Sequence, residues 1–155
     1  MIIGVIQAIP LSNRLLGLAG LIPFWGLAFL VVFTEETSSF HALKALITYG
    51  AIILSFLGGI HWGMAVQSIE KATWSRMGWG VTLSLIGWAA IFIPSLYALA
   101  LLVTALFAAL VIDLKLVDNY SEGNWYQILR ILLSLGAITA LLFTYLFLIL
   151  VKTVV

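Results

Sequence analysis

Ionisable side chains within apolar segments are the residues of this sequence that could do chemistry. His61 lies in the second long apolar run, Asp113 ends the fourth, and Arg130 lies near the start of the fifth. Such residues are costly to place in hydrocarbon and often mark a functional site. Consecutive antiparallel helices could bring Asp113 and Arg130 together as a bidentate pair. We expect these residues and Arg14, at the start of the first run, to gather at one end of a helical bundle.

Each of these residues also has a structural interpretation. The Asp113–Arg130 pair could fix the register of two helices, and we favour that role over a relay for protons or solutes. His61 could donate a hydrogen bond to a backbone carbonyl or to a hydroxyl such as that of Ser55. We favour this packing role over a switch, although imidazole is the side chain whose charge changes most readily near neutral pH.

No catalytic, metal-binding or cofactor-binding motif is present. The sequence has no cysteine and two histidines, His41 and His61, which should lie on opposite sides of the membrane. Neither a metal site nor a bis-histidine haem is therefore expected. A Gly-x-Ser-x-Gly elbow, a phosphate-binding loop and a dinucleotide fingerprint are all missing from the sequence. We expect a protein that is not an enzyme and that has no metal or cofactor.

The composition indicates that lipid is the solvent of this chain. Hydrophobic residues make up 64% of the 155 residues and charged residues 8%, whereas about a quarter of the residues in a soluble domain are charged. The net charge is +1 and no Lys/Arg cluster occurs, which argues against nucleic acid as a partner. We expect one transmembrane domain over residues 1–155.

Five apolar runs can cross a bilayer, which takes about 20 residues in a helix. The third and fourth crossings share one uncharged run, 79–112, which as a single helix would reach about 50 Å and overshoot the membrane. Pro94 and Ser95 near its middle predict a tight hairpin. The fold class is therefore all-α, a polytopic bundle with five transmembrane helices at 15–33, 45–66, 77–93, 95–112 and 127–151.

The start of the chain has two further features. Ser12 or Asn13 should cap the first helix. The apolar segment 2–9 is too short to span and should lie at the interface or against the bundle. No basic region precedes it, so a cleaved signal peptide is not expected.

Basic residues are divided unequally between the two faces that five crossings create. The amino-terminal face would hold Arg14, Lys71, Arg76, Lys115 and Arg130, and the opposite face Lys44 and Lys152. The positive-inside rule then predicts that the amino terminus is cytoplasmic and that the carboxyl terminus lies outside.

Small residues in the second predicted helix indicate close helix packing. Ser55, Gly59 and Gly63 recur every four residues and share a face on which another helix can approach closely. Gly58 lies on a different face, together with His61. Small residues on two faces predict a central position for this helix.

Tryptophans should mark the cytoplasmic interface. Trp62, Trp79 and Trp125 all fall near that end of their predicted helices, where an aromatic belt is common in membrane proteins. A second interpretation is that Trp62 and Trp125 form the walls of a shallow pocket around His61, open to lipid headgroups or to a partner helix.

Three segments, 14–24, 49–63 and 125–130, together resemble the transmembrane protein 69 family, a bacterial and mitochondrial domain of unknown function. The Leu-Ser-Phe-Leu-Gly-Gly sequence at 54–59 is the most distinctive part, and the resemblance extends from about Pro10 to the last predicted helix. It implies an inner-membrane location, supports five crossings and implies no established activity. With the charge distribution, it predicts a multi-pass protein of the bacterial inner membrane with a periplasmic carboxyl terminus.

These features favour an interaction protein, meaning a non-catalytic accessory subunit, assembly factor or scaffold of a larger membrane complex. Its partners would be membrane lipids and either other membrane proteins or copies of itself. One alternative is a small proton-linked transporter with a gate formed by His61, Asp113 and Arg130, although the internal repeat common in transporters is not evident. Another alternative is a lipid- or quinone-binding protein.

Overall fold

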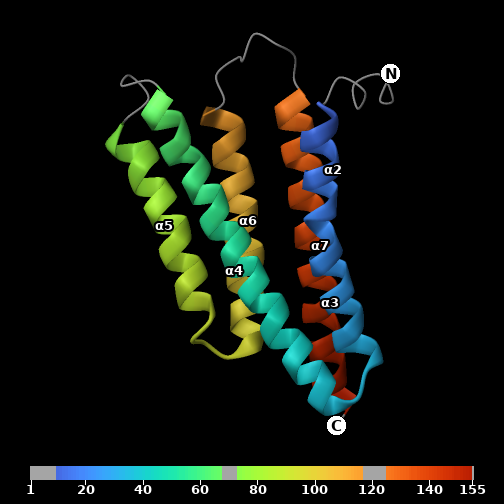
Figure 1. Ribbon diagram of the computed structural model, residues 1–155. Helices are drawn as coiled ribbons and strands as arrows, with labels where there is room; N and C mark the ends of the chain where they lie inside the picture. The colour runs from blue at the N-terminus through green and yellow to red at the C-terminus, as the bar shows by residue number, and fades with distance from the viewer. Residues whose placement is uncertain (1–9, 68–72, 117–124, 155) are drawn as a thin grey trace.

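Helices account for nearly all of the residues that the structure describes. The computed structural model describes residues 10–67, 73–116 and 125–154 (Figure 1). Its helices are α2 (Leu11–Ala19), α3 (Leu21–Phe33), α4 (Glu36–Gln67), α5 (Trp74–Ala90), α6 (Ser95–Leu116) and α7 (Trp125–Val154). The all-α prediction is confirmed. The predicted interfacial segment 2–9 and the charged residues Glu70 and Lys71 lie outside the described residues.

Among the residues that the structure describes, four helical stretches are long and apolar enough to cross a membrane. They are Leu11–Phe33, Glu36–Val66, Ser95–Lys115 and Trp125–Val151. Helix α5, which corresponds to the predicted third crossing, has 17 residues and is shorter than the about 20 residues that a crossing usually needs. The protein is therefore a membrane protein with several apolar helices, and four of its five predicted crossings have helices of the required length.

The first predicted helix is divided at Gly20 into α2 and α3. Pro23 in the first turn of α3 has no backbone N–H, so the carbonyl four residues earlier loses its helical donor. The Tyr49 hydroxyl of α4 donates to the Gly20 carbonyl oxygen at 2.9 Å. The break is thus a point of attachment to α4.

The predicted cap of the first helix was wrong. Helix α2 begins at Leu11, so Ser12 and Asn13 lie inside its first turn, and Pro10 is the flanking residue. The Pro10 carbonyl accepts from the Arg14 backbone N–H at 3.0 Å. Proline can begin a helix in this way because its φ angle already suits one.

Helix α4 begins at Glu36, well before the predicted boundary at 45, and has 32 residues. The helix is longer than the predicted crossing 45–66, because a helix can continue beyond the hydrocarbon. A carboxylate in the first turn, that of Glu36, interacts favourably with the helix dipole. Ser39 also donates through Oγ to the Val31 carbonyl at 2.8 Å, which joins α4 to α3.

The predicted hairpin between the third and fourth apolar helices is confirmed. Helix α5 ends at Ala90 and α6 begins at Ser95, directly after Pro94. At its other end α5 begins earlier than the predicted residue 77, because the Thr73 hydroxyl accepts from the Arg76 backbone N–H at 3.3 Å and caps the helix.

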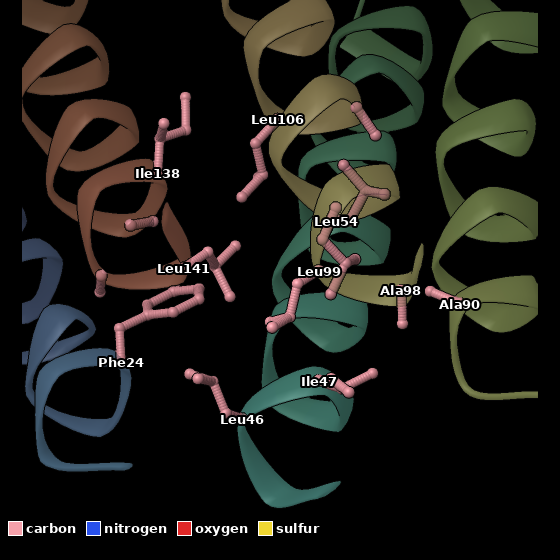
Figure 2. Close-up of a cluster of buried hydrophobic side chains, with 14 of the residues drawn as sticks. Phe24, Leu46, Ile47, Leu54, Ala90, Ala98, Leu99, Leu106, Ile138 and Leu141 are labelled. Atoms are coloured by element: carbon pink, nitrogen blue, oxygen red, sulfur yellow. The ribbon is translucent and has the colours of Figure 1, made fainter. Parts of the chain in front are cut away.

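Helix α4 packs against α3, α5 and α6, and α7 closes the bundle by packing against α3 and α6. The central position predicted for the second apolar helix, which is α4, is confirmed. Figure 2 shows the core between these helices, where Phe24 of α3, Leu54 of α4 and Leu141 of α7 are buried. The core is continuous through the bundle and fixes the relative positions of the helix ends.

Glycines allow α4 and α5 to pack backbone against backbone. A Cβ atom on Gly58 would collide with the Gly80 carbonyl oxygen, and one on Gly87 would lie 2.7 Å from the Ala51 carbonyl oxygen. The two contacts, Gly58 with Gly80 and Ala51 with Gly87, are separated by seven residues along α4 and by seven residues along α5. This spacing is expected for two antiparallel helices packed along one seam.

The closely packed face of α4 is therefore that of Gly58 and not the predicted Ser55–Gly59–Gly63 stripe. Among the residues that the structure describes, no atom lies within 4 Å of a Cβ added to Gly59 or Gly63. Both glycines are exposed, and Ser55 is half-buried. Gly59 and Gly63 thus lie on the outside of the described part of the bundle.

Candidate functional site

Three charged or polar side chains from three helices form one buried chain of bonds. His61 Nε2 of α4 lies 3.0 Å from Asp113 Oδ1 of α6, and Arg130 Nε of α7 donates to Asp113 Oδ2 at 2.6 Å. The exposed fractions of His61, Asp113 and Arg130 are 3%, 5% and 7%. The expected contact between Asp113 and Arg130 is therefore present, and His61 joins it.

The Asp113–Arg130 pair has one bond and is not bidentate as predicted. The second carboxylate oxygen is occupied by His61, and the guanidinium turns its Nη1 atom towards Ser134, donating to Oγ at 2.9 Å. Sequence reasoning missed Ser134. Its position four residues after Arg130 on one helix face was the signal that could have identified it.

The site lies near the end of the bundle where α4 and α6 end and α7 begins (Figure 1). At about 1.5 Å per residue, Asp113 is about 4.5 Å from the end of α6, Arg130 about 7.5 Å from the start of α7, and His61 about 9 Å from the end of α4. Burial of charges at this depth requires that they be paired and hydrogen-bonded. The Arg130–Asp113 ion pair meets that requirement.

His61 has a carboxylate as its partner and not the backbone carbonyl or the Ser55 hydroxyl that was predicted. An ionised carboxylate only accepts hydrogen bonds, so Nε2 must carry the hydrogen that is donated to Asp113. The other ring nitrogen, Nδ1, is buried and has no hydrogen-bond partner among the described residues. The arrangement holds the imidazole in one orientation.

A cavity of about 160 Å³ reaches the guanidinium end of this site. It lies between α2, α3, α4, α6 and α7, and Arg130 and Ser134 line it beside apolar residues such as Phe24 and Leu57. Arg130 Nη2 is buried without a hydrogen-bond partner among the described residues. The site therefore combines a spare cationic donor with an apolar space.

The two tryptophans predicted to share a pocket lie on different helices, α4 and α7. Trp62 lies against α5, where a separate cavity is lined by Trp62, Trp74 and Val81. Trp125 begins α7 and packs edge-on against Tyr126, with 6.0 Å between the ring centroids. The cavity that reaches the buried ion pair lies on the other side of α4, towards α2 and α7.

Arg14, predicted to join the cluster, lies on α2 and is half-buried. The bonds of the site join α4, α6 and α7. Among the described residues there is no group of three His, Asp or Glu side chains that could hold a metal ion. The contacts that the structure shows at the site are hydrogen bonds and one charge pair.

Comparisons with known proteins find one matching family model and relatives that are named as transmembrane proteins. A family model described as "Protein of unknown function (DUF3429)" matches residues 9–146. The chain is 34% identical over 138 residues to transmembrane protein 69 of Xenopus tropicalis, covering 85% of the chain and 53% of that relative. It is also 34% identical over 131 residues to transmembrane protein 69 of Mus musculus, covering 82% of the chain and 52% of that relative.

The chain thus spans about half the length of the curated relatives that it matches. No solved structure matches it.

Proposed function

Because the chain belongs to the transmembrane protein 69-like family, whose shared domain has no known function, we propose its role from its geometry. The protein acts as a non-catalytic subunit, assembly factor or scaffold that binds other membrane proteins through an outward face of α4. We call this face, made of Ser55, Gly59 and Gly63, the outer α4 stripe.

The observation that carries the proposal is that the outer α4 stripe is not covered by the described part of the chain. Nothing in it lies within 4 Å of a Cβ on Gly59 or Gly63. Glycine weakens a helix by about 1 kcal/mol relative to alanine, and small residues four apart are the usual means by which membrane helices approach closely. A partner helix in contact with the stripe would explain why glycine occupies both positions.

The buried site supports a structural role inside the chain. Asp113 bonds to both His61 and Arg130, and the three residues join α4, α6 and α7 at one end. A clamp of this kind would hold α4, and with it the outer stripe, in a fixed orientation.

The proposal includes five crossings with a cytoplasmic amino terminus and a periplasmic carboxyl terminus in a bacterial inner membrane. Helix α5 supplies the remaining crossing, because it lies antiparallel to α4 along their glycine seam. Two features support this topology. The start of α2 and the end of α7 lie at opposite ends of the bundle (Figure 1), and Arg14, Arg76 and Lys115 lie near the helix ends on the side where α2 begins.

The transporter alternative has less support. A gate formed by His61, Asp113 and Arg130 would need a polar path, whereas the cavity beside these residues is lined mostly by apolar side chains. The alternative of binding a lipid or quinone has one specific observation in its favour, the spare donor of Arg130 beside that cavity.

Purification at native abundance in a mild detergent tests the proposed role. The unaltered chain should co-purify with a partner membrane protein in a fixed ratio. The double variant Gly59→Leu and Gly63→Leu should fold with the parent's thermal stability, because both positions face open space, and should lose the partner.

Gly26→Leu is the matched control, since Gly26 on α3 is also exposed and also has nothing within 4 Å of a Cβ. It should retain the partner. Equal loss in the control, or recovery of the unaltered chain alone or as a homomer under every gentle condition, would overturn the proposal.

A further inference from the structure

The guanidinium of Arg130 has more donors than the described residues satisfy. Its Nε bonds to Asp113 and its Nη1 to Ser134, while Nη2 is buried and has no partner in the described ranges. A buried donor without a partner costs about 1–3 kcal/mol, and more when the group is charged. A residue that is 7% exposed cannot recover this energy from bulk water.

The cavity beside Arg130 offers donors at one end and apolar surface elsewhere. Arg130 and Ser134 both line it, and the Ser134 hydroxyl, which accepts from Arg130, retains its own hydrogen to donate. The rest of the lining is apolar or glycine and includes Leu16, Phe24 and Phe56. The complementary ligand has an apolar body and ends in an acceptor that carries no hydrogen.

Charge decides between a neutral and an anionic acceptor. Asp113 lies 2.6 Å from Arg130 and already compensates the guanidinium charge. A second carboxylate or a phosphate would place two anions around one cation in a region of low dielectric constant, which is unfavourable. A neutral carbonyl oxygen accepts from the spare N–H without adding charge.

The cavity communicates with the lipid-facing surface between α2 and α4. Leu16 of α2 and Phe56 of α4 line it, and they are 74% and 64% exposed. Figure 1 shows α4 running obliquely, near α3 at the end with the carboxyl terminus and farther from α2 at the end with the buried site. A molecule dissolved in the bilayer can therefore enter the cavity that Arg130 lines without passing through water.

The size of the cavity limits what enters. Its volume of about 160 Å³ is close to that of apolar protein cavities of about 150 Å³ that hold one benzene ring. One ring or a short length of chain fits, and the remainder of the molecule must extend into the lipid.

We propose that this cavity binds the carbonyl end of a membrane-soluble molecule, which enters from the bilayer between α2 and α4 and accepts hydrogen bonds from Arg130 and Ser134. A quinone ring and the ester carbonyl of an acyl lipid are two sources of this chemistry. The site is distinct from the outer α4 stripe and does not depend on the proposed partner.

The test uses the full chain in lipid nanodiscs and two probes. The first is a benzoquinone with a decyl tail, titrated while the thermal unfolding midpoint is followed. The second compares dioleoyl phosphatidylcholine with its ether-linked analogue, which lacks ester carbonyls. Leu16→Trp narrows the mouth of the cavity, and Leu18→Trp on the same helix is the matched control, because Leu18 is exposed but does not line the cavity.

If the ligand is a quinone, the thermal unfolding midpoint should rise with quinone concentration in the parent and in Leu18→Trp. The variants Leu16→Trp and Ser134→Ala should then weaken the apparent affinity for the quinone by about tenfold or more. An ester lipid predicts no response to quinone but a lower midpoint in ether lipid, and Leu16→Trp removes this difference.

The proposal is overturned if neither probe changes the midpoint. It is also overturned if the probes shift the unfolding midpoints of Leu16→Trp and Leu18→Trp equally. Because the outer α4 stripe is intact in these variants, partner recovery distinguishes failure of this site from failure of the proposed subunit role.

Discussion

At the scale of single residues, Asp113 is the centre of the buried site because it accepts from both His61 and Arg130. The net charge of Asp113 and Arg130 together is zero, so the pair can lie within an apolar bundle. Removing one member leaves the other as a buried charge without compensation, and this is far more costly than losing the whole pair.

A double-mutant cycle measures this dependence. Asp113→Asn and Arg130→Met should each lower the free energy of unfolding by about 3–5 kcal/mol, because each leaves an uncompensated charge. The double variant should lose clearly less than the sum of the two. Lys115→Met, which removes an exposed charge on α6, should stay within about 0.5 kcal/mol of the parent.

Reversible unfolding in detergent with increasing denaturant gives these free energies. Additive losses in the double variant would contradict the assignment of a buried, mutually dependent pair.

At the scale of helices, the association of α4 with α5 depends on the absence of side chains at a few positions. The backbones approach at Gly58 and Gly80 and again at Ala51 and Gly87. Without a hydrophobic driving force in lipid, van der Waals contact of this kind holds membrane helices together. The adjacent glycines Gly58 and Gly59 of α4 therefore differ in position, because Gly58 is buried against α5 and Gly59 is exposed.

The pair Gly58 and Gly59 allows a direct comparison. Gly58→Ala should destabilise the protein by about 1–3 kcal/mol, because its methyl group meets the Gly80 carbonyl oxygen. Gly59→Ala meets nothing within 4 Å and should be neutral or stabilising by up to about 1 kcal/mol through its better helix propensity. Thermal unfolding in detergent distinguishes the two, and equal midpoints would contradict the proposed seam.

At the scale of the whole molecule, the apolar runs predicted most of the architecture. Pro94 within an uncharged run was enough to predict the hairpin, since a single helix would overshoot the bilayer. The boundary of α4 at Glu36 could not be predicted from hydropathy, because a helix can extend beyond the membrane. The break at Gly20 follows from Pro23, whose missing N–H was a visible signal in the sequence.

The sequence predicted the part of the site that the connection between α6 and α7 brings together. Asp113 and Arg130 lie at the ends of consecutive antiparallel helices, so their contact followed from the order of the helices. The contact of His61 with Asp113 depends on the register between α4 and α6, which no local pattern specifies. Periodicity likewise showed that Gly59 and Gly63 share a face, but it did not show which face of α4 the other helices cover.

The central claim is a bundle that crosses the membrane five times, with the buried ion pair at its cytoplasmic end. Its most direct test uses the absence of cysteine from the chain. Single cysteines replace Trp74 at the start of α5 and Phe92 in the hairpin, both of which are exposed, and intact cells are treated with a membrane-impermeant maleimide. The account predicts labelling of Phe92→Cys in intact cells and of Trp74→Cys only after permeabilisation, whereas labelling of both from one side, or the reverse pattern, would contradict it.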